Sequence, residues 1–166
     1  MQVRLANPDD TSLIFSFIQK KAEFDRKIGA FSGKLRVSEE KISKTLFGKI
    51  PFAYVLFVAT ERCEVGLAIY AFRYSSFVGQ PSIWLDDLYI DENKRSQGAG
   101  TVLMSQLAQV AEENDCTHLA WSADARNVRG LNFYDRLGAE IIDKKNHRCF
   151  FQWIPPFFEH GDSHFK

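Results

Sequence analysis

Apolar residues in the first fifty positions recur at the spacing of amphipathic helices. A short predicted strand, Val3–Leu5, is followed by "NPDD", which is typical of a helix start because Asn7 can act as N-cap and a proline suits the first turn. Apolar side chains then repeat at helical spacing from Leu13 to Phe24. The glycines of "GAFSGK" interrupt this pattern, and "SEEKISKTLFGK" begins a new one with Ser38 as its cap. We therefore predict two consecutive helices near the N-terminus.

From Phe52 onward the pattern changes to the aromatic and β-branched composition of strands. The segments "FAYVLFVAT" and "GLAIYAFRY" are separated by the charged turn "ERCE", which predicts an antiparallel hairpin. "SIWLDDLYI" is predicted as a third strand, "THLAWSA" as a later one, and "AEIID" and "RCFFQWI" as the final pair.

Two further helices separate the later strands. One follows "NKRSQGAG" and ends near Asn114, and its apolar face is formed by Val102, Leu103, Leu107, Val110 and Ala111. The other is "VRGLNFYDRLG", which Gly138 closes. This order predicts an α/β fold, with a strand meander first and βαβα units second. We expect one domain over residues 1–166, with a short C-terminal tail from about residue 155.

Composition narrows the class of protein. A hydrophobic fraction of 45% and a charged fraction of 25% are typical of a globular chain, and Lys+Arg and Asp+Glu balance at 21 each, which argues against a nucleic-acid partner. No segment approaches the about 20 apolar residues of a membrane span, and the N-terminus lacks a secretory signal pattern, so we predict a cytoplasmic protein with no membrane partner. The isolated Cys63, Cys116 and Cys149 are expected to be buried reduced thiols, and we predict no metal site.

The glycine-rich segment at Asn93–Leu103 joins a predicted strand to a predicted helix. Backbone N–H groups at a helix start have no partner within the helix, and the helix dipole adds partial positive charge, so such a junction attracts phosphate. Gly98 and Gly100 let the backbone approach an anion, and Lys94 and Arg95 add charge. A plain strand-to-helix turn is the alternative interpretation.

Two phosphate-binding motifs do not fit this segment. A P-loop requires Lys and then Ser or Thr after its second glycine, whereas Gly100 is followed by Thr101 and Val102. The dinucleotide fingerprint requires a third glycine or an alanine where this chain has Leu103. A nucleoside-triphosphate site and a dinucleotide site are therefore both disfavoured.

The remaining pattern, R-x-x-G-x-G from Arg95 to Gly100, resembles the acyl-CoA pyrophosphate loop of the GNAT superfamily of N-acetyltransferases. "WLDDLYIDENKRSQGAG" looks like the central strand and loop of that family, and "NVRGLNFYDRLGAE" looks like its later segment, so the resemblance extends to about Trp153. Within the superfamily the chain is most similar to the diamine and polyamine branch, with its spermidine/spermine and thialysine acetyltransferases. The resemblance implies a three-layer fold in which helices flank a mixed, mostly antiparallel sheet.

The resemblance also implies a binding site for acetyl-CoA as co-substrate. The strand before the loop is expected to splay from its neighbour and to pair with pantetheine through Leu88, Tyr89 and Ile90. The loop residues expected at the diphosphate are Arg95, Ser96, Gln97, Gly98, Ala99, Gly100 and Thr101. Asn127 matches a family asparagine that touches CoA, although an asparagine that caps the following helix would look the same.

Acetyl transfer to an amine needs a neutral amine and a proton for the leaving thiolate, and an alkyl amine is rarely neutral at pH 7. The resemblance places Tyr134 beside the sulfur as general acid and as a cofactor contact; a helix tyrosine with its ring in the core is the alternative. It gives Asp86 a role in water-mediated deprotonation and Asp87 a contact with the cationic substrate. Strand alternation would place these two carboxylates on opposite faces of the sheet. A solvated strand edge is the alternative explanation for two acids at this place.

Acceptor recognition is the least specific part of the pattern. Glu23, Phe24 and Asp25 sit where the polyamine branch carries acidic and aromatic helix residues, although a solvated helix face also explains Glu23 and Asp25. Phe77 lies near a position that is tryptophan in some members of that branch. We expect an N-acetyltransferase that acts on a small-molecule amine, namely a diamine, a polyamine or a lysine-like compound, by direct attack in a ternary complex. A protein or peptide acetyltransferase and a non-catalytic CoA-binding module are the alternatives. The polyamine-branch resemblance also implies a homodimer.

Overall fold

The computed structural model describes residues 1–156 of the chain. Its centre is a seven-stranded sheet with the strand order β1-β2-β3-β4-β5-β7-β6. In chain order the strands are β1 (Gln2–Leu5), β2 (Tyr54–Ala59), β3 (Glu64–Ser75), β4 (Gln80–Ile90), β5 (Leu119–Asp124), β6 (Glu140–Lys145) and β7 (Arg148–Trp153). The C-terminal tail expected from about residue 155 consists mainly of residues 157–166, which lie outside the described residues.

Neighbouring strands are antiparallel except in one place among those described. β4 and β5 run parallel, and α3 (Ala99–Glu113) connects them. The other five pairs of neighbouring strands are antiparallel, including the predicted β2–β3 hairpin. The mixed, mostly antiparallel sheet implied by the family resemblance is therefore confirmed.

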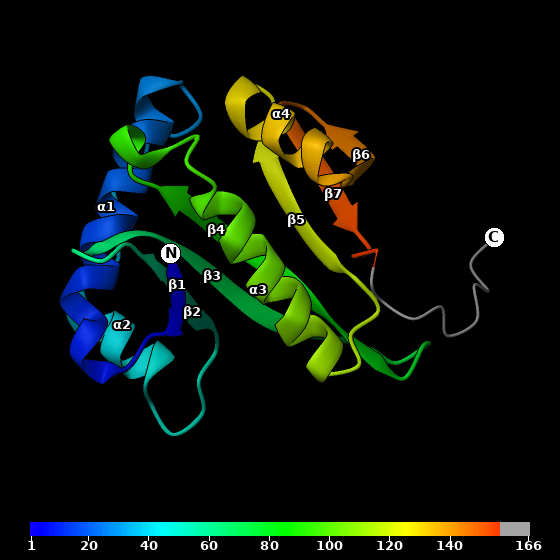
Figure 1. The fold of residues 1–166 in the computed structure, drawn as a ribbon, viewed down its shortest axis with the longest axis horizontal. Helices are drawn as coiled ribbons and strands as arrows, with labels where there is room; N and C mark the ends of the chain where they lie inside the picture. The colour runs from blue at the N-terminus through cyan, green and yellow to red at the C-terminus, as the bar shows by residue number, and fades with distance from the viewer. Residues whose placement is uncertain (157–166) are drawn as a thin grey trace.

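Helices cover both faces of the sheet (Figure 1). α1 (Thr11–Lys27) and α2 (Glu39–Leu46) pack on one face, where Ile14 is completely buried against β2 to β4. α3 and α4 (Val128–Leu137) pack on the other face, where Leu103 is completely buried. The predicted three-layer arrangement is confirmed. Of the described helices, none has the length and apolar character needed to cross a lipid bilayer.

The first helix begins later than the "NPDD" signal suggested. The Asn7 side chain accepts a hydrogen bond from the Asp9 N–H at 2.9 Å, but it caps a short 3-10 helix, Pro8–Asp10, and α1 starts at Thr11. The Asp10 carboxylate accepts a hydrogen bond from the Asn7 N–H at 2.8 Å and so completes a capping box around this single turn. The capping residues therefore stabilise the turn that leads into α1 rather than α1 itself.

The cysteines only partly follow the prediction. Cys116 and Cys149 are buried free thiols, as expected, whereas Cys63 is exposed in the turn between β2 and β3. The charged residues around Cys63 place it in a hairpin turn, and such turns lie at the surface. The prediction of burial was therefore wrong for Cys63.

Candidate functional site

β4 and β5 diverge after two residue pairs and leave a groove between them. The two strands pair at Ile83–Leu119 and at Trp84–Ala120, yet β4 continues as a strand as far as Ile90. The backbone of residues 88–90 therefore forms an edge along the groove with no β5 partner. This is the divergence that the family resemblance implied.

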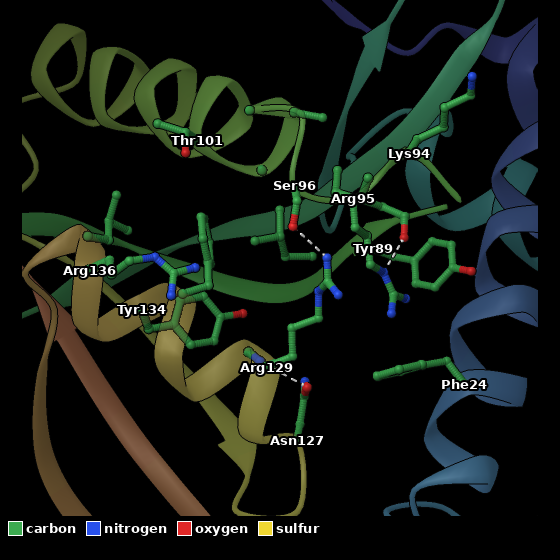
Figure 2. A pocket seen from close by; sticks show the side chains of 18 of the residues that line it. Phe24, Tyr89, Lys94, Arg95, Ser96, Thr101, Asn127, Arg129, Tyr134 and Arg136 are labelled. Atoms are coloured by element: carbon green, nitrogen blue, oxygen red, sulfur yellow. Dashed lines mark hydrogen bonds between the residues drawn. The ribbon is translucent and has the colours of Figure 1, made fainter. Parts of the chain in front are cut away.

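The groove opens into a cavity of about 460 Å³, here called the cationic cavity, between β4, the loop before α3, α3 and α4 (Figure 2). Among residues 1–156, its lining includes no carboxylate but five cationic side chains, which belong to Lys21, Lys94, Arg95, Arg129 and Arg136. Leu88, Phe133 and Leu137 add apolar surface. A cavity with this charge and shape suits an elongated ligand that is anionic at one end.

The N-terminus of α3 faces the cationic cavity. Gly98 is the N-cap at φ +88°, and Ser96 also has a left-handed backbone at φ +60°. These two conformations turn the chain so that α3 starts at Ala99 with N–H groups that have no partner within the helix. The Ser96 hydroxyl accepts a hydrogen bond of 2.9 Å from Arg129, which holds that guanidinium beside the loop (Figure 2). The predicted loop residues that line the cavity are Arg95, Ser96, Gly98, Ala99, Gly100 and Thr101.

Two loop side chains also support the loop itself. The Arg95 guanidinium carbon lies 4.4 Å from the centre of the Phe24 ring, and Arg95 Nε donates a 2.9 Å hydrogen bond to the Ile90 carbonyl. Gln97 is exposed, and its Nε2 donates a long hydrogen bond of 3.5 Å to the Asn93 carbonyl. Gln97 does not line the cavity, so the structure does not bring this predicted residue into the site.

Asn127 has the capping role that the sequence left open. Its Oδ1 accepts a hydrogen bond of 3.0 Å from the Gly130 N–H and caps α4. A Cβ atom on Gly130 would lie 2.6 Å from Asn127 Nδ2, so the cap depends on a glycine at that position. The Asn127 side chain nevertheless lines the cationic cavity, and a capping role is therefore compatible with a ligand contact.

A second cavity of about 260 Å³, here called the acidic cavity, lies beside the first. Four carboxylates line it, from Asp25, Asp86, Asp87 and Asp124, together with the cations Lys21 and Arg148. Asp124 is held by Arg126, whose Nη2 lies 2.8 Å from Asp124 Oδ2, and this contact lowers the pKa of Asp124 to about 2. The charge of this cavity therefore suits a cationic ligand.

A β-bulge at Asp86 brings both predicted acids to the acidic cavity. Ile69 of β3 pairs with Asp87, but the next residue, Tyr70, pairs with Leu85, so Asp86 is an extra residue in β4. The bulge interrupts side-chain alternation, and both carboxylates line the same cavity. The expectation that alternation separates them to opposite faces was therefore wrong. Asp86 is exposed within the cavity, whereas Asp87 is partly buried.

Lys21 of α1 connects two carboxylates of the acidic cavity. Its Nζ lies 2.5 Å from Asp25 Oδ2 and 3.2 Å from Asp87 Oδ1. Burial disfavours the Lys21 ammonium, but the attraction of Asp87 and Asp25 outweighs burial and raises the pKa of Lys21, so Lys21 is cationic at neutral pH. Burial also raises the pKa of Asp87, and the Lys21 charge offsets only part of that effect.

Tyr134 lies where the two cavities meet. It lines both of them, together with Lys21, Leu88 and Asn127. Its ring packs in the core, 4.9 Å from the ring of Trp121 and 5.1 Å from that of Phe151 between centroids.

Figure 2 shows the Tyr134 side chain extending from α4 toward the space in front of β4. Burial, and then the negative charge of Asp87, raise the pKa of Tyr134. The ring lies in the core, which was the alternative interpretation of the sequence, and the raised pKa keeps the hydroxyl protonated.

Two predicted acceptor residues are not brought into either cavity. Glu23 is exposed on α1 and lines neither cavity, because its neighbours Lys21, Phe24 and Asp25 are the residues that face the site. Phe77 is fully exposed in the turn between β3 and β4, far along the hairpin from the diverging end of β4. The structure therefore does not bring Glu23 or Phe77 together with the other predicted site residues.

Sequence reasoning did not assign Lys21, Asp124 or Arg148 to the site. Lys21 lies four residues before Asp25 in a helix, a spacing that is most often a surface ion pair, so the pattern gave no sign that Lys21 lines a cavity. Asp124 is the last residue of β5 and Arg148 is the first residue of β7, and the two pair across these neighbouring strands. The sheet pairing that joins them carries no local sequence signal.

Known proteins resemble this chain over most of its length. Residues 31–139 match the Acetyltransferase (GNAT) family. A thialysine N-epsilon-acetyltransferase from Bos taurus is 30% identical over 159 residues, which cover 90% of this chain and 91% of the relative. An L-ornithine N5-acetyltransferase from Arabidopsis thaliana is 22% identical, with 85% of this chain and 80% of the relative covered.

Solved structures share the fold at lower sequence identity. An aminoglycoside acetyltransferase from an uncultured soil metagenomic sample superimposes with a TM-score of 0.71 at 18% identity. The match covers 88% of this chain and 92% of the aminoglycoside acetyltransferase chain. A ribosomal-protein-alanine N-acetyltransferase from Brucella melitensis superimposes with a TM-score of 0.70 at 17% identity. The match covers 88% of this chain and 97% of the Brucella melitensis protein. Their names give different acceptors, so this similarity concerns the fold alone. Because the family match spans well over half of the sequence, the chain belongs to the GNAT family of acetyltransferases.

Proposed function

We propose that this acetyltransferase transfers an acetyl group from acetyl-CoA to the primary amine of a small molecule, namely a diamine, a polyamine or a lysine-like compound. One observation carries the proposal: a cavity lined by cations and a cavity rich in carboxylates meet at the Tyr134 side chain. An anionic donor and a cationic acceptor would each enter the cavity of opposite charge, and their reacting atoms would meet beside Tyr134.

The residues of the cationic cavity fit CoA. The N–H groups at the start of α3, from Ala99 onward, and the guanidinium of Arg129 are suited to hold a diphosphate. The backbone edge of residues 88–90 has no β5 partner and is suited to the amide groups of pantetheine. Acetyl-CoA supplies, when bound, the thioester carbonyl that the acceptor amine attacks.

Two side chains near the junction, those of Asp86 and Tyr134, are suited to the two proton transfers of the reaction. Asp86 is exposed in the acidic cavity and is suited to accept the proton of the acceptor ammonium through a water molecule. The Tyr134 hydroxyl is suited to donate its proton to the leaving sulfur, because its raised pKa keeps it protonated. Direct attack in a ternary complex needs no covalent intermediate on the protein.

The relatives support a small amine as acceptor. The names of two relatives give thialysine and ornithine as their substrates, and both compounds are amino acids with a side-chain amine. Asp86, in a cavity whose lining has more carboxylates than cations, suits the cationic amine that is to be acetylated.

The test is release of free CoA, measured with a thiol reagent, over a panel of amines that includes diamines, polyamines, lysine, thialysine, ornithine and lysine-containing peptides. The proposal expects turnover with at least one small amine. Turnover of peptides alone would identify a peptide acetyltransferase and overturn the small-molecule assignment. CoA binding without turnover of any amine would identify a CoA-binding module instead.

A further inference from the structure

Lys21 places a primary ammonium of the protein inside the acceptor side of the site. Its side chain lines both cavities, and its Nζ contacts Asp25 and Asp87 at 2.5 and 3.2 Å. A lysine ammonium is the same chemical group as the end of an alkyl diamine. The two carboxylates therefore already bind an alkylammonium ion, which the protein itself supplies.

The other charges of the acidic cavity leave little attraction for a second ammonium. Asp124 is paired with Arg126, and Arg148 lies on the same wall of the cavity. Within residues 1–156, Asp86 is the one carboxylate of this cavity that has neither an ion pair nor a side-chain hydrogen bond, and the proposed function assigns it to the reacting amine, so it does not serve the second ammonium.

The charge carried by the acceptor at the moment of attack depends on its second amine. The attacking nitrogen must be neutral, so a monoamine attacks as an uncharged molecule, whereas a diamine still carries one ammonium and a triamine carries two. A second ammonium gains affinity only where a carboxylate is free to receive it.

From these contacts we infer that Lys21 is a specificity-determining residue that fills the subsite of a second acceptor ammonium. Asp25 and Asp87 hold the Lys21 ammonium where they would otherwise hold that of a diamine or polyamine. The wild-type site consequently gives no advantage to an acceptor with a second positive charge. This inference rests on the proposed function, because it concerns the acceptor of the same site.

Butylamine and 1,4-diaminobutane provide a matched test, because they have the same chain length and differ by one amine. The wild-type protein is expected to use the two with kcat/KM values within a few-fold of each other. In Lys21→Met the two carboxylates become free, and the kcat/KM ratio of diamine to monoamine should rise by about tenfold or more, mainly through a lower KM for the diamine. The rise should shrink in high salt, because an added ion pair is screened.

Two variants control for charge and for folding. Lys21→Arg keeps the cation and should retain the wild-type ratio. Lys20→Met removes a neighbouring lysine whose Nζ pairs with Asp91 at 3.0 Å and which lines neither cavity, so the ratio should not change. The melting temperature of each variant, with and without CoA, reports whether the fold and the donor site are intact.

The outcomes separate this inference from the proposed function. If the wild-type protein turns over no small amine, the proposed function itself fails. If the wild-type protein turns over both amines and Lys21→Met leaves their ratio unchanged, the inference alone is overturned. An equal loss of turnover with both amines in a folded Lys21→Met would also overturn it, because Lys21 would then act in the chemistry and not in selection.

Discussion

The Tyr134 side chain combines a buried ring with a hydroxyl at the junction of the two cavities. Tyr134→Phe removes the hydroxyl and keeps the ring contacts with Trp121 and Phe151. We therefore expect kcat to fall by about 10² to 10⁴, the usual contribution of a general acid, while CoA affinity and melting temperature stay near the wild-type values. Steady-state kinetics and calorimetric CoA titration measure both effects, and unchanged turnover would remove Tyr134 from the mechanism.

The pH dependence of the reaction follows from the same hydroxyl. Because burial and Asp87 raise the pKa of Tyr134 above its ordinary value of 10.0, its acid form persists to higher pH than that of a free tyrosine. We expect kcat to show no decline between about pH 8 and 9.5, while kcat/KM rises as the acceptor amine, with a pKa of about 10.4, loses its proton. A pH profile of both constants tests this, and a kcat that falls with an apparent pKa below about 9 would contradict it.

The residues of the cationic cavity were easier to predict than those of the acidic cavity for a physical reason. The residues from Leu88 to Thr101 form one continuous strand-loop-helix segment, so their spacing alone predicts that they lie together. The residues of the acidic cavity come from α1, β4, β5 and β7, and only the folded sheet brings them together. Lys21 in particular has the sequence neighbours of an ordinary surface lysine.

At the scale of elements, the start of α3 depends on the left-handed backbone of Gly98. A Cβ atom at Gly98 would meet nothing within 4 Å, so Gly98→Ala adds backbone strain without a steric clash. We expect this strain to cost about 1 kcal/mol of stability and to shift the N–H groups of the first turn, which raises the KM for acetyl-CoA several-fold. Denaturant unfolding and initial-rate kinetics measure the two quantities.

Gly79 provides the matched control for that prediction. It lies in the turn between β3 and β4 at φ +75°, and its Cβ position is equally open. Gly79→Ala should therefore lose similar stability while the KM for acetyl-CoA stays unchanged. Similar KM values in both alanine variants would mean that the geometry of the α3 N-terminus does not determine donor binding.

β4 shows which features of an element the sequence could and could not predict. The run "SIWLDDLYI" correctly predicts a strand, because aromatic and branched residues favour a pleated backbone. The bulge at Asp86 has no such signal, since the extra residue is defined only by the pairing of β4 with β3. A single inserted residue reverses the faces of all later side chains, and it accounts for the joint position of Asp86 and Asp87.

At the scale of the molecule, the order of the strands also depends on burial more than on chain order. β6 directly follows α4 in the chain, yet β7 takes the place beside β5. Every residue of β6 is exposed, whereas Cys149, Phe151 and Trp153 of β7 are buried. The more apolar strand therefore occupies the inner position, and this placement brings Arg148 to the acidic cavity.

One ion-pair cluster connects three separate parts of the fold and predicts how the free energy of unfolding depends on pH. Arg4 of β1 lies 2.7 Å from Asp10, at the start of α1, and 2.7 Å from Glu64, at the start of β3. Hydrogen bonds from Arg4 are the main cause that lowers the pKa of both carboxyl groups. Groups with a lowered folded-state pKa stabilise the protein above their ordinary values of 3.8 and 4.5, and this contribution is lost as pH falls through the folded-state values.

Arg4→Met should therefore reduce the free energy of unfolding at pH 7 by about 1 kcal/mol, a modest amount because Arg4 is partly exposed. The difference from the wild-type protein should shrink as the pH falls from about 5 to 3, since both proteins then lose the charged carboxylates. Urea unfolding at pH 7 and at pH 3.5 measures the two differences.

Lys27→Met is the control, because its ion pair with Glu92 is exposed on both sides and should contribute little at either pH. A difference between wild-type and Arg4→Met proteins that stays constant with pH would show that Arg4 stabilises the fold by packing over Phe57, 5.0 Å away, and not through its carboxylate partners.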